Sequence, residues 1–287
     1  MTALDDADAG TAGEIPPVAV GDELIPGYVV VELLRRGRRL DTYDVLSVER
    51  RCPCIVKIVR PDRAHEQRPA HALTQEGELL RRLTHPHLVR CYEVIETPYP
   101  AIVLETLPGD MLSAVIEDGR LAATDVAELG LQLTSVLAYL HDNGWLHLDV
   151  KPSNIVVAAG RATLIDLSLA APPGSGRAGA GTRGYLAPEQ AAGGPLLPAT
   201  DVFGLGVTLG ECLTGTLAYG NEATWDGPRW IRRARIAPRR RFVRQIARRA
   251  PLLAPLVGSC LATDPSQRPS IADVRAALRH PRQDDSA

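Results

Sequence analysis

The sequence predicts an α+β fold, with a small antiparallel sheet and one helix in the first third of the chain and mainly helices afterwards. Two observations carry this prediction. Clusters of β-branched residues separated by turns fill residues 28–60, as is typical of strands. Beyond residue 108, apolar residues no longer recur at every second position but about every 3.6 residues, which is the period of a helix. A chain of 287 residues, 45% of them hydrophobic, is large enough to bury a full core.

The sequence pattern of the N-terminal third predicts several strands and a single helix. Residues 28–60 supply three antiparallel strands, which a charged turn at 35–40 interrupts. Apolar residues at helical spacing predict a helix over 73–83, and His85-Pro86 ends it. Two further apolar runs, at 88–95 and 101–104, complete the small sheet.

The remaining residues predict helices with two short strands between them. A long amphipathic helix over 124–143 ends at Asn143-Gly144, and a strongly apolar helix covers 200–213. Between them lie strands near 155–157 and 163–165. The segment 170–184 is rich in Gly, Ala, Pro and Ser and has no period, so it predicts a flexible functional loop.

The net charge of −2 conceals two segregated regions. Residues 1–23 contain six acids and no base, which predicts a solvated acidic leader. Residues 229–249 contain ten arginines and no acid, and Phe242, Val243 and Ile246 give their second half an apolar face. An acidic partner, the chain's own leader or a nucleic acid can bind such a block. A solvated helix face is the simpler interpretation, and a nucleic acid is the least expected partner.

Composition also limits the compartment and the metal chemistry. No apolar run reaches the length of a membrane span, and the acidic N-terminus is unlike a secretory signal, so we expect a cytoplasmic protein with no membrane partner. Five cysteines are an odd number, which favours reduced thiols over disulfides. Cys52-Pro-Cys54 has no partner CxxC or HxxxH, so ordinary strand residues are expected there instead of half a metal site.

Three motifs in order carry the chemistry of the chain. They are His147-Leu-Asp-Val-Lys-Pro-Ser-Asn154, Asp166-Leu-Ser168 and Gly181-Thr-Arg-Gly-Tyr-Leu-Ala-Pro-Glu189. They resemble the HRDxKxxN, DFG and APE elements of eukaryotic-like (Hanks-type) Ser/Thr protein kinases, and the resemblance covers about residues 24–280. It implies a bilobal protein-kinase fold that uses ATP and Mg²⁺ to phosphorylate a protein substrate. The implied parts are a leader at 1–22, an N-lobe at 23–107, a C-lobe at 108–281 and a tail at 282–287.

The resemblance assigns a task to each polar residue of the second half. Asp149 would orient the incoming hydroxyl and take its proton, and Lys151 would neutralise charge on the moving phosphate. Asn154 and Asp166 are oxygen donors of the kind Mg²⁺ prefers. Further matches are a buried aspartate, Asp201, an ion pair between Glu189 and Arg268, and Thr182, which would bond Asp149 and Lys151.

In the first half of the chain, the resemblance implies which residues bind the nucleotide. Lys57 matches the VAIK lysine that holds the α and β phosphates. Glu76 is its expected partner, with Glu78 as a competitor that points from a different helix face. Glu105-Thr106-Leu107 would form the hinge that contacts adenine, after Leu104 as gatekeeper.

Only two of the 32 basic residues are lysine, Lys57 and Lys151. Two lysines placed at random among the basic positions would fall on this pair about once in 500 times. A point charge with rotatable donors suits phosphate at these positions better than a planar guanidinium. The two lysines therefore favour a working enzyme.

Three departures weaken the match. The glycine-rich loop GxGxxGxV is replaced by residues 35–42, which keep only Gly37, so the phosphate cradle is expected to be impaired. The four arginines there can bind phosphate or form a solvated turn. Leu148 replaces the arginine before Asp149, which makes a switch driven by loop phosphorylation less expected. Leu167 and Ser168 replace the Phe and Gly of DFG.

The sequence therefore leaves three functions open. The preferred one is a protein Ser/Thr kinase. The second is a pseudokinase that uses the same fold to bind ATP or act as a scaffold, which the degraded glycine loop supports. The third is a small-molecule phosphotransferase, although such enzymes typically lack the segment ending at Glu189 and the equivalent of Lys151.

Overall fold

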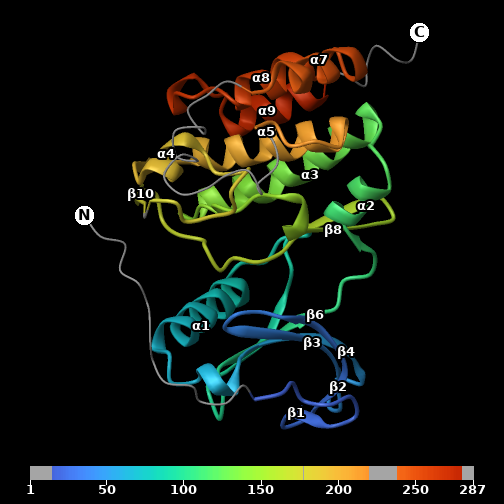
Figure 1. Ribbon diagram of the computed structural model, residues 1–287, viewed down its shortest axis with the longest axis vertical. Helices are drawn as coiled ribbons and strands as arrows, with labels where there is room; N and C mark the ends of the chain where they lie inside the picture. The colour runs from blue at the N-terminus through green and yellow to red at the C-terminus, as the bar shows by residue number, and fades with distance from the viewer. Residues whose placement is uncertain (1–14, 177, 220–237, 280–287) are drawn as a thin grey trace. The chain divides into compact units, whose positions relative to one another are not determined.

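The computed structural model describes residues 15–176, 178–219 and 238–279. The chain divides into two compact units. The first comprises residues up to Arg82 together with Arg90–Thr106, and the second comprises Leu83–Val89 and the chain from Leu107 on. The first unit holds a sheet and one long helix, whereas the second is mainly helical (Figure 1), which confirms the predicted α+β class.

The first unit is built on an antiparallel sheet in which six strands follow the order β1-β2-β3-β4-β6-β5. Side chains alternate between its faces, so that Tyr43 and Val45 of β3 and Val56 of β4 are buried on one side. The strands are β1 (Glu23–Ile25), β2 (Tyr28–Arg36), β3 (Leu40–Ser47), β4 (Cys52–Val59), β5 (Cys91–Ile95) and β6 (Ala101–Glu105).

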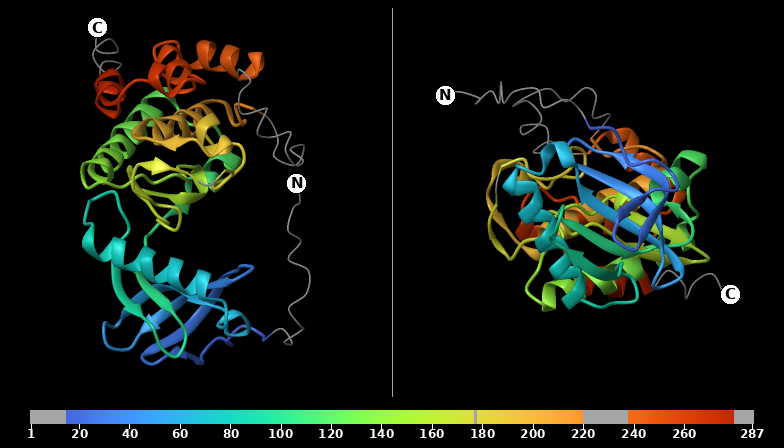
Figure 2. Two further views of the ribbon diagram at one scale, coloured as in Figure 1. Left: turned by 90° about the vertical axis from the view of Figure 1, so that its left-hand side faces the viewer. Right: turned by 90° about the horizontal axis from the view of Figure 1, so that it is seen from below.

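Helix α1 (Gln67–Arg82) packs against β4, β5 and β6 (Figure 2). Leu73, Leu79 and Leu80 form its buried face, as the apolar spacing predicts. Gly77 permits the close approach, since a Cβ there would lie 2.5 Å from a methyl of Ile102. The helix begins earlier than the predicted residue 73, because its first turn carries no apolar period.

In the second unit, helices α3 and α5 form the centre of the core. Helix α3 packs against α5 and α9, and α5 also packs against α7 and α8 (Figure 1). The helices are α2 (Leu112–Asp118), α3 (Ala123–Asp142), α4 (Pro188–Ala192), α5 (Pro198–Thr214), α7 (Arg240–Arg249), α8 (Ala254–Cys260) and α9 (Ile271–Arg279). Short 3-10 turns are η1 (Pro61–Arg63) in the first unit and η2 (Pro152–Asn154) and η4 (Pro265–Gln267) in the second.

Two small sheets complete the second unit. Strands β7 (Asp110–Met111), β8 (Ile155–Ala158) and β9 (Arg161–Leu164) form one of them. The other pairs β10 (Gly174–Ser175), inside the Gly-, Ala-, Pro- and Ser-rich segment 170–184, with β11 (Pro195–Leu196), which lies beyond that segment. Backbone pairing over two residues needs no apolar period, so the sequence carries no sign of it. Within the described residues, no helix is long and apolar enough to cross a membrane.

Helix α7 and the N-cap residue before it, Arg239, carry the described arginines of the arginine-rich block. Phe242 and Ile246 are buried, but Val243 is 50% exposed, so its predicted place on the apolar face is wrong. One residue turns a helix by about 100°, so a neighbour of Phe242 points elsewhere. Arginines 239, 240, 241, 244, 248 and 249 are exposed. Arginines 229, 232, 233 and 235 lie outside the described residues, as do most of the leader and the tail.

All five cysteines are free thiols, as predicted. Cys52 is half-buried, whereas burial raises the pKa of the Cys54 and Cys91 thiols to about 11 and that of Cys260 to about 12. The thiolate is the reactive form, so we expect iodoacetamide to modify Cys52 first in the native protein and the buried thiols only after unfolding in urea. Mass spectrometry over time measures the order. Modification of Cys212 as fast as Cys52 would contradict it.

Candidate functional site

In the first unit, Lys57 and Glu76 form a buried ion pair. Lys57 lies in β4, opposite Thr42 of β3 and Ile102 of β6. Its Nζ donates to Oε1 of Glu76 at 2.7 Å, and the side chains are 15% and 1% exposed. Glu78 instead lies 3.5 Å from Arg81, with both side chains about half exposed. The helix face that packs on the sheet therefore selects Glu76 and leaves Glu78 at the surface.

The β2–β3 turn occupies the place of the glycine-rich loop. The Gly37 N–H donates to the Leu40 carbonyl at 2.8 Å, and a Cβ on Gly37 would lie 2.5 Å from that oxygen. The turn itself therefore requires glycine. Two of its arginines contact acids, Arg36 with Asp41 at 3.5 Å and Arg39 with Glu66 at 2.9 Å. Arg35 and Arg38 are exposed.

The predicted hinge follows β6. Leu104 is buried, and the Glu105 backbone N–H donates to the Arg90 carbonyl at 3.0 Å. The Glu105 carboxylate in turn accepts the Arg90 N–H at 2.8 Å, which fixes the end of the strand. The Thr106 hydroxyl oxygen is buried without a hydrogen-bond partner in the described part of the chain. At Leu107 the chain enters the second unit.

In the second unit, Asp149 is the centre of a hydrogen-bonded cluster. Its Oδ2 accepts from Lys151 Nζ at 2.5 Å and from Asn154 Nδ2 at 3.1 Å. Its Oδ1 accepts the backbone N–H of Thr182 at 3.0 Å, and Lys151 Nζ also donates to the Thr182 hydroxyl. Thr182 comes from a segment 33 residues further along the chain. Three donors thus fix both oxygens of one carboxylate.

A buried aspartate holds the backbone that leads into this cluster. Asp201, in the first turn of α5, accepts the N–H of His147 at 2.9 Å and that of Leu148 at 2.7 Å. Leu148 has φ +66°, a left-handed conformation that costs about 1–3 kcal/mol for a non-glycine residue. The carboxylate offsets that cost by binding both amides.

Two further residues, neither of them expected from the sequence, support the loop. Gln190 donates from Nε2 to the carbonyls of Leu148 and Ala180, each at 2.7 Å. His141 Nε2 lies 2.9 Å from Asp201 Oδ2. No signal in the sequence links Gln190 to Leu148, 42 positions earlier, or His141 to Asp201, 60 positions later.

Asn154 and Asp166 are placed together by the β8–β9 hairpin. Leu164 pairs with Ile155, and the Ile165 N–H donates to the Asn154 carbonyl at 2.9 Å, so Asp166 follows directly beside Asn154. Asn154 Nδ2 bonds to Asp149, which leaves its Oδ1 as the acceptor of the amide. Two such oxygens fit Mg²⁺, which takes one or two protein ligands plus phosphates and water. The described residues contain no cluster of three His, Cys, Asp or Glu side chains able to hold a metal alone.

Glu189 and Arg268 form the ion pair that the sequence predicts. The guanidinium donates to both carboxylate oxygens, at 2.7 and 2.8 Å, and its side chain is fully buried. Arg268 also donates to the carbonyls of Ala262, Ala199 and Thr263 and lies over the Phe203 ring. The Glu189–Arg268 ion pair thus connects the start of α4 to the segment that follows α8.

Comparisons with known proteins agree with this arrangement. The chain is 30% identical over 238 residues to the ovarian-specific serine/threonine-protein kinase Lok of Drosophila melanogaster, covering 76% of this chain and 49% of that protein. It is 31% identical over 272 residues to the probable serine/threonine-protein kinase PkwA of Thermomonospora curvata, covering 92% and 35%. Serine/threonine-protein kinase PknD of Mycobacterium tuberculosis is 30% identical over 208 residues, covering 70% and 31%.

The chain thus spans about a third to a half of the length of these curated relatives. Residues 28–281 match the family described as "Protein kinase domain". This range contains the Lys57–Glu76 pair, the Asp149 cluster and the Glu189–Arg268 pair. The chain belongs to the protein kinase domain family.

Proposed function

We propose that the protein is a serine/threonine protein kinase that transfers the γ-phosphate of ATP to a hydroxyl of a protein substrate. The observation that carries the proposal is the cluster in which Asp149 is bonded to Lys151, Asn154 and Thr182. In this cluster a carboxylate suited to accept a proton is held beside an ammonium group suited to neutralise phosphate. The relatives that the chain resembles are named serine/threonine-protein kinases.

In the proposed reaction, Asp149 accepts a hydrogen bond from the substrate hydroxyl and takes its proton as the new O–P bond forms. The bond between the γ-phosphorus and its bridging oxygen breaks, and ADP leaves with the electron pair. Lys151 neutralises charge on the moving group, and its contact with Thr182 keeps the ammonium in place. Asn154 and Asp166 would hold Mg²⁺, which neutralises charge on the phosphates when bound.

The nucleotide would be held by residues of the first unit and the segment that follows it. Lys57, oriented by Glu76, suits the α and β phosphates as a point charge. Gly37 lies in the turn where the family covers the phosphates. Glu105 and Leu107 would offer their backbone groups to adenine.

The exposed arginines of α7 are proposed to bind an acidic segment of a partner protein. Arg240, Arg244 and Arg248 follow one another at helical spacing on the side away from buried Phe242 and Ile246. The described residues of α7 include no acid to neutralise them. We do not expect a nucleic acid there.

Transfer of labelled phosphate from Mg·ATP tests the proposed function. The wild-type protein is expected to label itself or a generic basic protein, whereas Asp149→Asn and Lys57→Met are not. Nucleotide binding is measured in parallel by calorimetry. A wild-type protein that labels no better than Asp149→Asn while still binding Mg·ATP would refute the kinase proposal.

That last result would support the alternative, a pseudokinase that binds ATP or acts as a scaffold. One observation favours it. The single glycine kept in the turn is explained by the Gly37–Leu40 hydrogen bond without any phosphate. The complete Asp149 cluster favours the kinase, because a scaffold would have no need of a half-buried ammonium group between Asp149 and Thr182.

A further inference from the structure

The β2–β3 turn concentrates positive charge in the first unit. Four arginines occupy residues 35–39, with Gly37 between the two pairs. The Gly37 N–H donates to the Leu40 carbonyl, so this backbone amide is already used within the turn. The arginine side chains are therefore the groups with which the turn can bind an anion.

Two of the four arginines have no acidic partner. Arg36 and Arg39 each contact a carboxylate. Arg35 and Arg38 are exposed, and neither makes a hydrogen bond or an ion pair with another described residue. Their charges are not neutralised by these residues, so the turn attracts negative groups.

One of these two arginines lies on the face of the sheet that carries Lys57. Strands β2, β3 and β4 lie side by side (Figure 1), and Arg35 is paired with Thr42, which is paired in turn with Lys57. Residues directly opposite each other in antiparallel strands point to the same face. Adjacent strands are about 4.8 Å apart, so the backbone of Arg35 lies about 10 Å from that of Lys57. An anion bound to Arg35 thus competes with phosphates held by Lys57.

The residues that follow the acidic leader are bound to this same turn. The carbonyl of Ile15, the first described residue, accepts from Arg36 Nη2 at 2.6 Å. The Val18 N–H donates to the Tyr43 hydroxyl at 3.2 Å, which holds the next residues on β3. Residues 1–14 of the leader, which precede this attachment, contain four acids and no basic side chain.

The leader is long enough to reach the exposed arginines. Side chains alternate along a strand, so Arg36, which binds Ile15, points to the opposite face from Arg35. An extended chain spans about 3.3–3.6 Å per residue, so Asp8 can lie up to about 25 Å from Ile15. This length is sufficient for a path around the end of the turn to the face that carries Lys57.

We propose that the acidic leader binds the arginines of the β2–β3 turn in its own chain and competes there with the phosphates of ATP. Aspartates of the leader pair with Arg35 and Arg38, which lowers the affinity for the nucleotide. The inference rests on the proposed function for ATP as the competing anion. Binding of the leader itself requires neither a nucleotide nor phosphate transfer.

Calorimetry on a full-length variant with a neutral leader tests the competition. The variant carries Asp5→Asn, Asp6→Asn, Asp8→Asn and Glu14→Gln, and it is titrated beside the wild type with Mg·ATP and with adenosine. We expect Mg·ATP to bind the variant about three- to tenfold more tightly, since two or three exposed ion pairs no longer compete. Adenosine has no phosphate and should bind both proteins equally. In about 1 M salt, which screens charges beyond about 3 Å, the difference for Mg·ATP should disappear.

Two matched pairs of arginine variants locate the surface. In Arg35→Gln with Arg38→Gln, neutralising the leader should no longer change the affinity for Mg·ATP. Arg51→Gln with Arg82→Gln makes the same charge change at exposed positions away from the turn, and there the effect of the leader should persist. Arg51 lies beyond the other end of β3, about 25 Å along the strand at about 3.3 Å per residue.

Crosslinking locates the leader in the absence of nucleotide. A photoreactive amino acid in place of Ala7 of the full chain should crosslink to residues 34–40, and saturating Mg·ATP should lower the yield. Mixing chains of normal and heavy isotopes separates a leader that binds its own chain from one that binds a second copy.

Three results would overturn the proposal: the neutral leader leaves the affinity for Mg·ATP unchanged, the two arginine double variants behave alike, or the crosslinks map elsewhere, such as to α7 or to a second copy. The titrations are repeated on Asp149→Asn, in which the effect of the leader on Mg·ATP binding should be the same as in the wild type. A protein whose leader controls Mg·ATP binding but which transfers no phosphate would refute the proposed function and leave this inference standing.

Discussion

Asp149→Asn is expected to lower the rate of phosphate transfer about 10²–10⁴-fold, the usual contribution of a general base. An amide cannot take the proton of the hydroxyl. It also places an NH₂ group among three donors, Lys151 Nζ, the Thr182 N–H and Asn154 Nδ2, which all bond to the carboxylate in the wild-type protein. Initial rates at saturating Mg·ATP, with kcat and KM for the protein substrate separated, measure the loss.

Two controls separate a chemical effect from unfolding. Affinity for Mg·ATP should stay close to that of the wild type, because Lys57, the residue proposed to hold the phosphates, keeps its hydrogen bond to Glu76. Asp142→Asn, which removes an exposed carboxylate from the end of α3, should leave kcat unchanged. If kcat falls less than about tenfold in Asp149→Asn, Asp149 is not the general base.

Helices and strands with a strong local pattern could be predicted from the sequence. The apolar period and Asn143-Gly144 predict a helix over 124–143, and α3 spans Ala123–Asp142. Gly144 has φ +79°, a conformation that glycine adopts easily and that ends a helix. Strand β4 likewise follows from its β-branched residues. In these elements, the buried face and the residues that end the element are both set by amino acids close together in the sequence.

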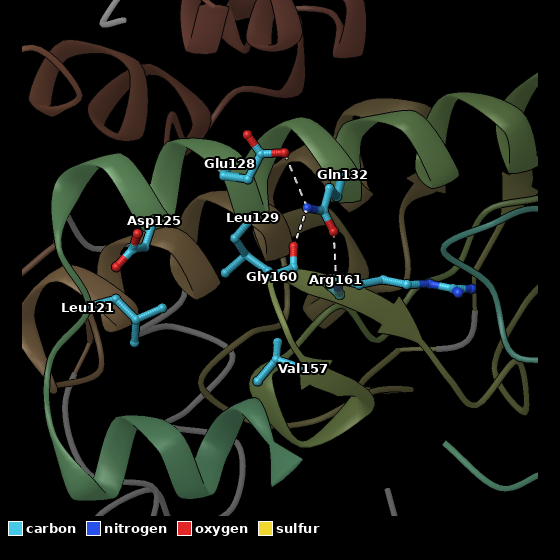
Figure 3. Close-up of a pocket in the computed structure, with 9 residues that line it drawn as sticks. Leu121, Asp125, Glu128, Leu129, Gln132, Val157, Gly160 and Arg161 are labelled. Carbon is cyan, nitrogen blue, oxygen red and sulfur yellow. Dashed lines mark hydrogen bonds between the residues drawn. The ribbon is translucent and has the colours of Figure 1, made fainter. Parts of the chain in front are cut away.

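The remaining features depend on residues far apart in the chain. Gln190 supports the Asp149 loop because folding brings it to the Leu148 carbonyl, 42 residues earlier, and no spacing encodes this contact. The cluster of Asp149 and Thr182 was expected only because the motifs resemble a known family. A pocket lined by α3 and the β8–β9 turn (Figure 3) likewise combines residues from distant parts of the chain, and its residues show no motif.

Arg268→Met is expected to destabilise the second unit by about 3–5 kcal/mol, the range for breaking a buried ion pair. The change leaves the Glu189 carboxylate, 9% exposed, without its bidentate partner. It also removes the donor to the carbonyls of Ala262 and Ala199, each bonded at 2.8 Å. Native-state hydrogen exchange of α5 amides measures the loss of stability within the second unit. A global unfolding transition would not do so, because it mixes the stabilities of the two units.

The matched control is Arg81→Met, which breaks the half-exposed pair with Glu78 and should cost no more than about 1 kcal/mol. The double variant Glu189→Leu with Arg268→Met should recover part of the stability, because no charge is then buried alone. Recovery should be incomplete, since the carbonyls that Arg268 binds stay without a donor. If Arg268→Met lowers stability no more than Arg81→Met does, the buried Glu189–Arg268 pair does not stabilise the unit. The segment after α8 is then held by its apolar contacts alone.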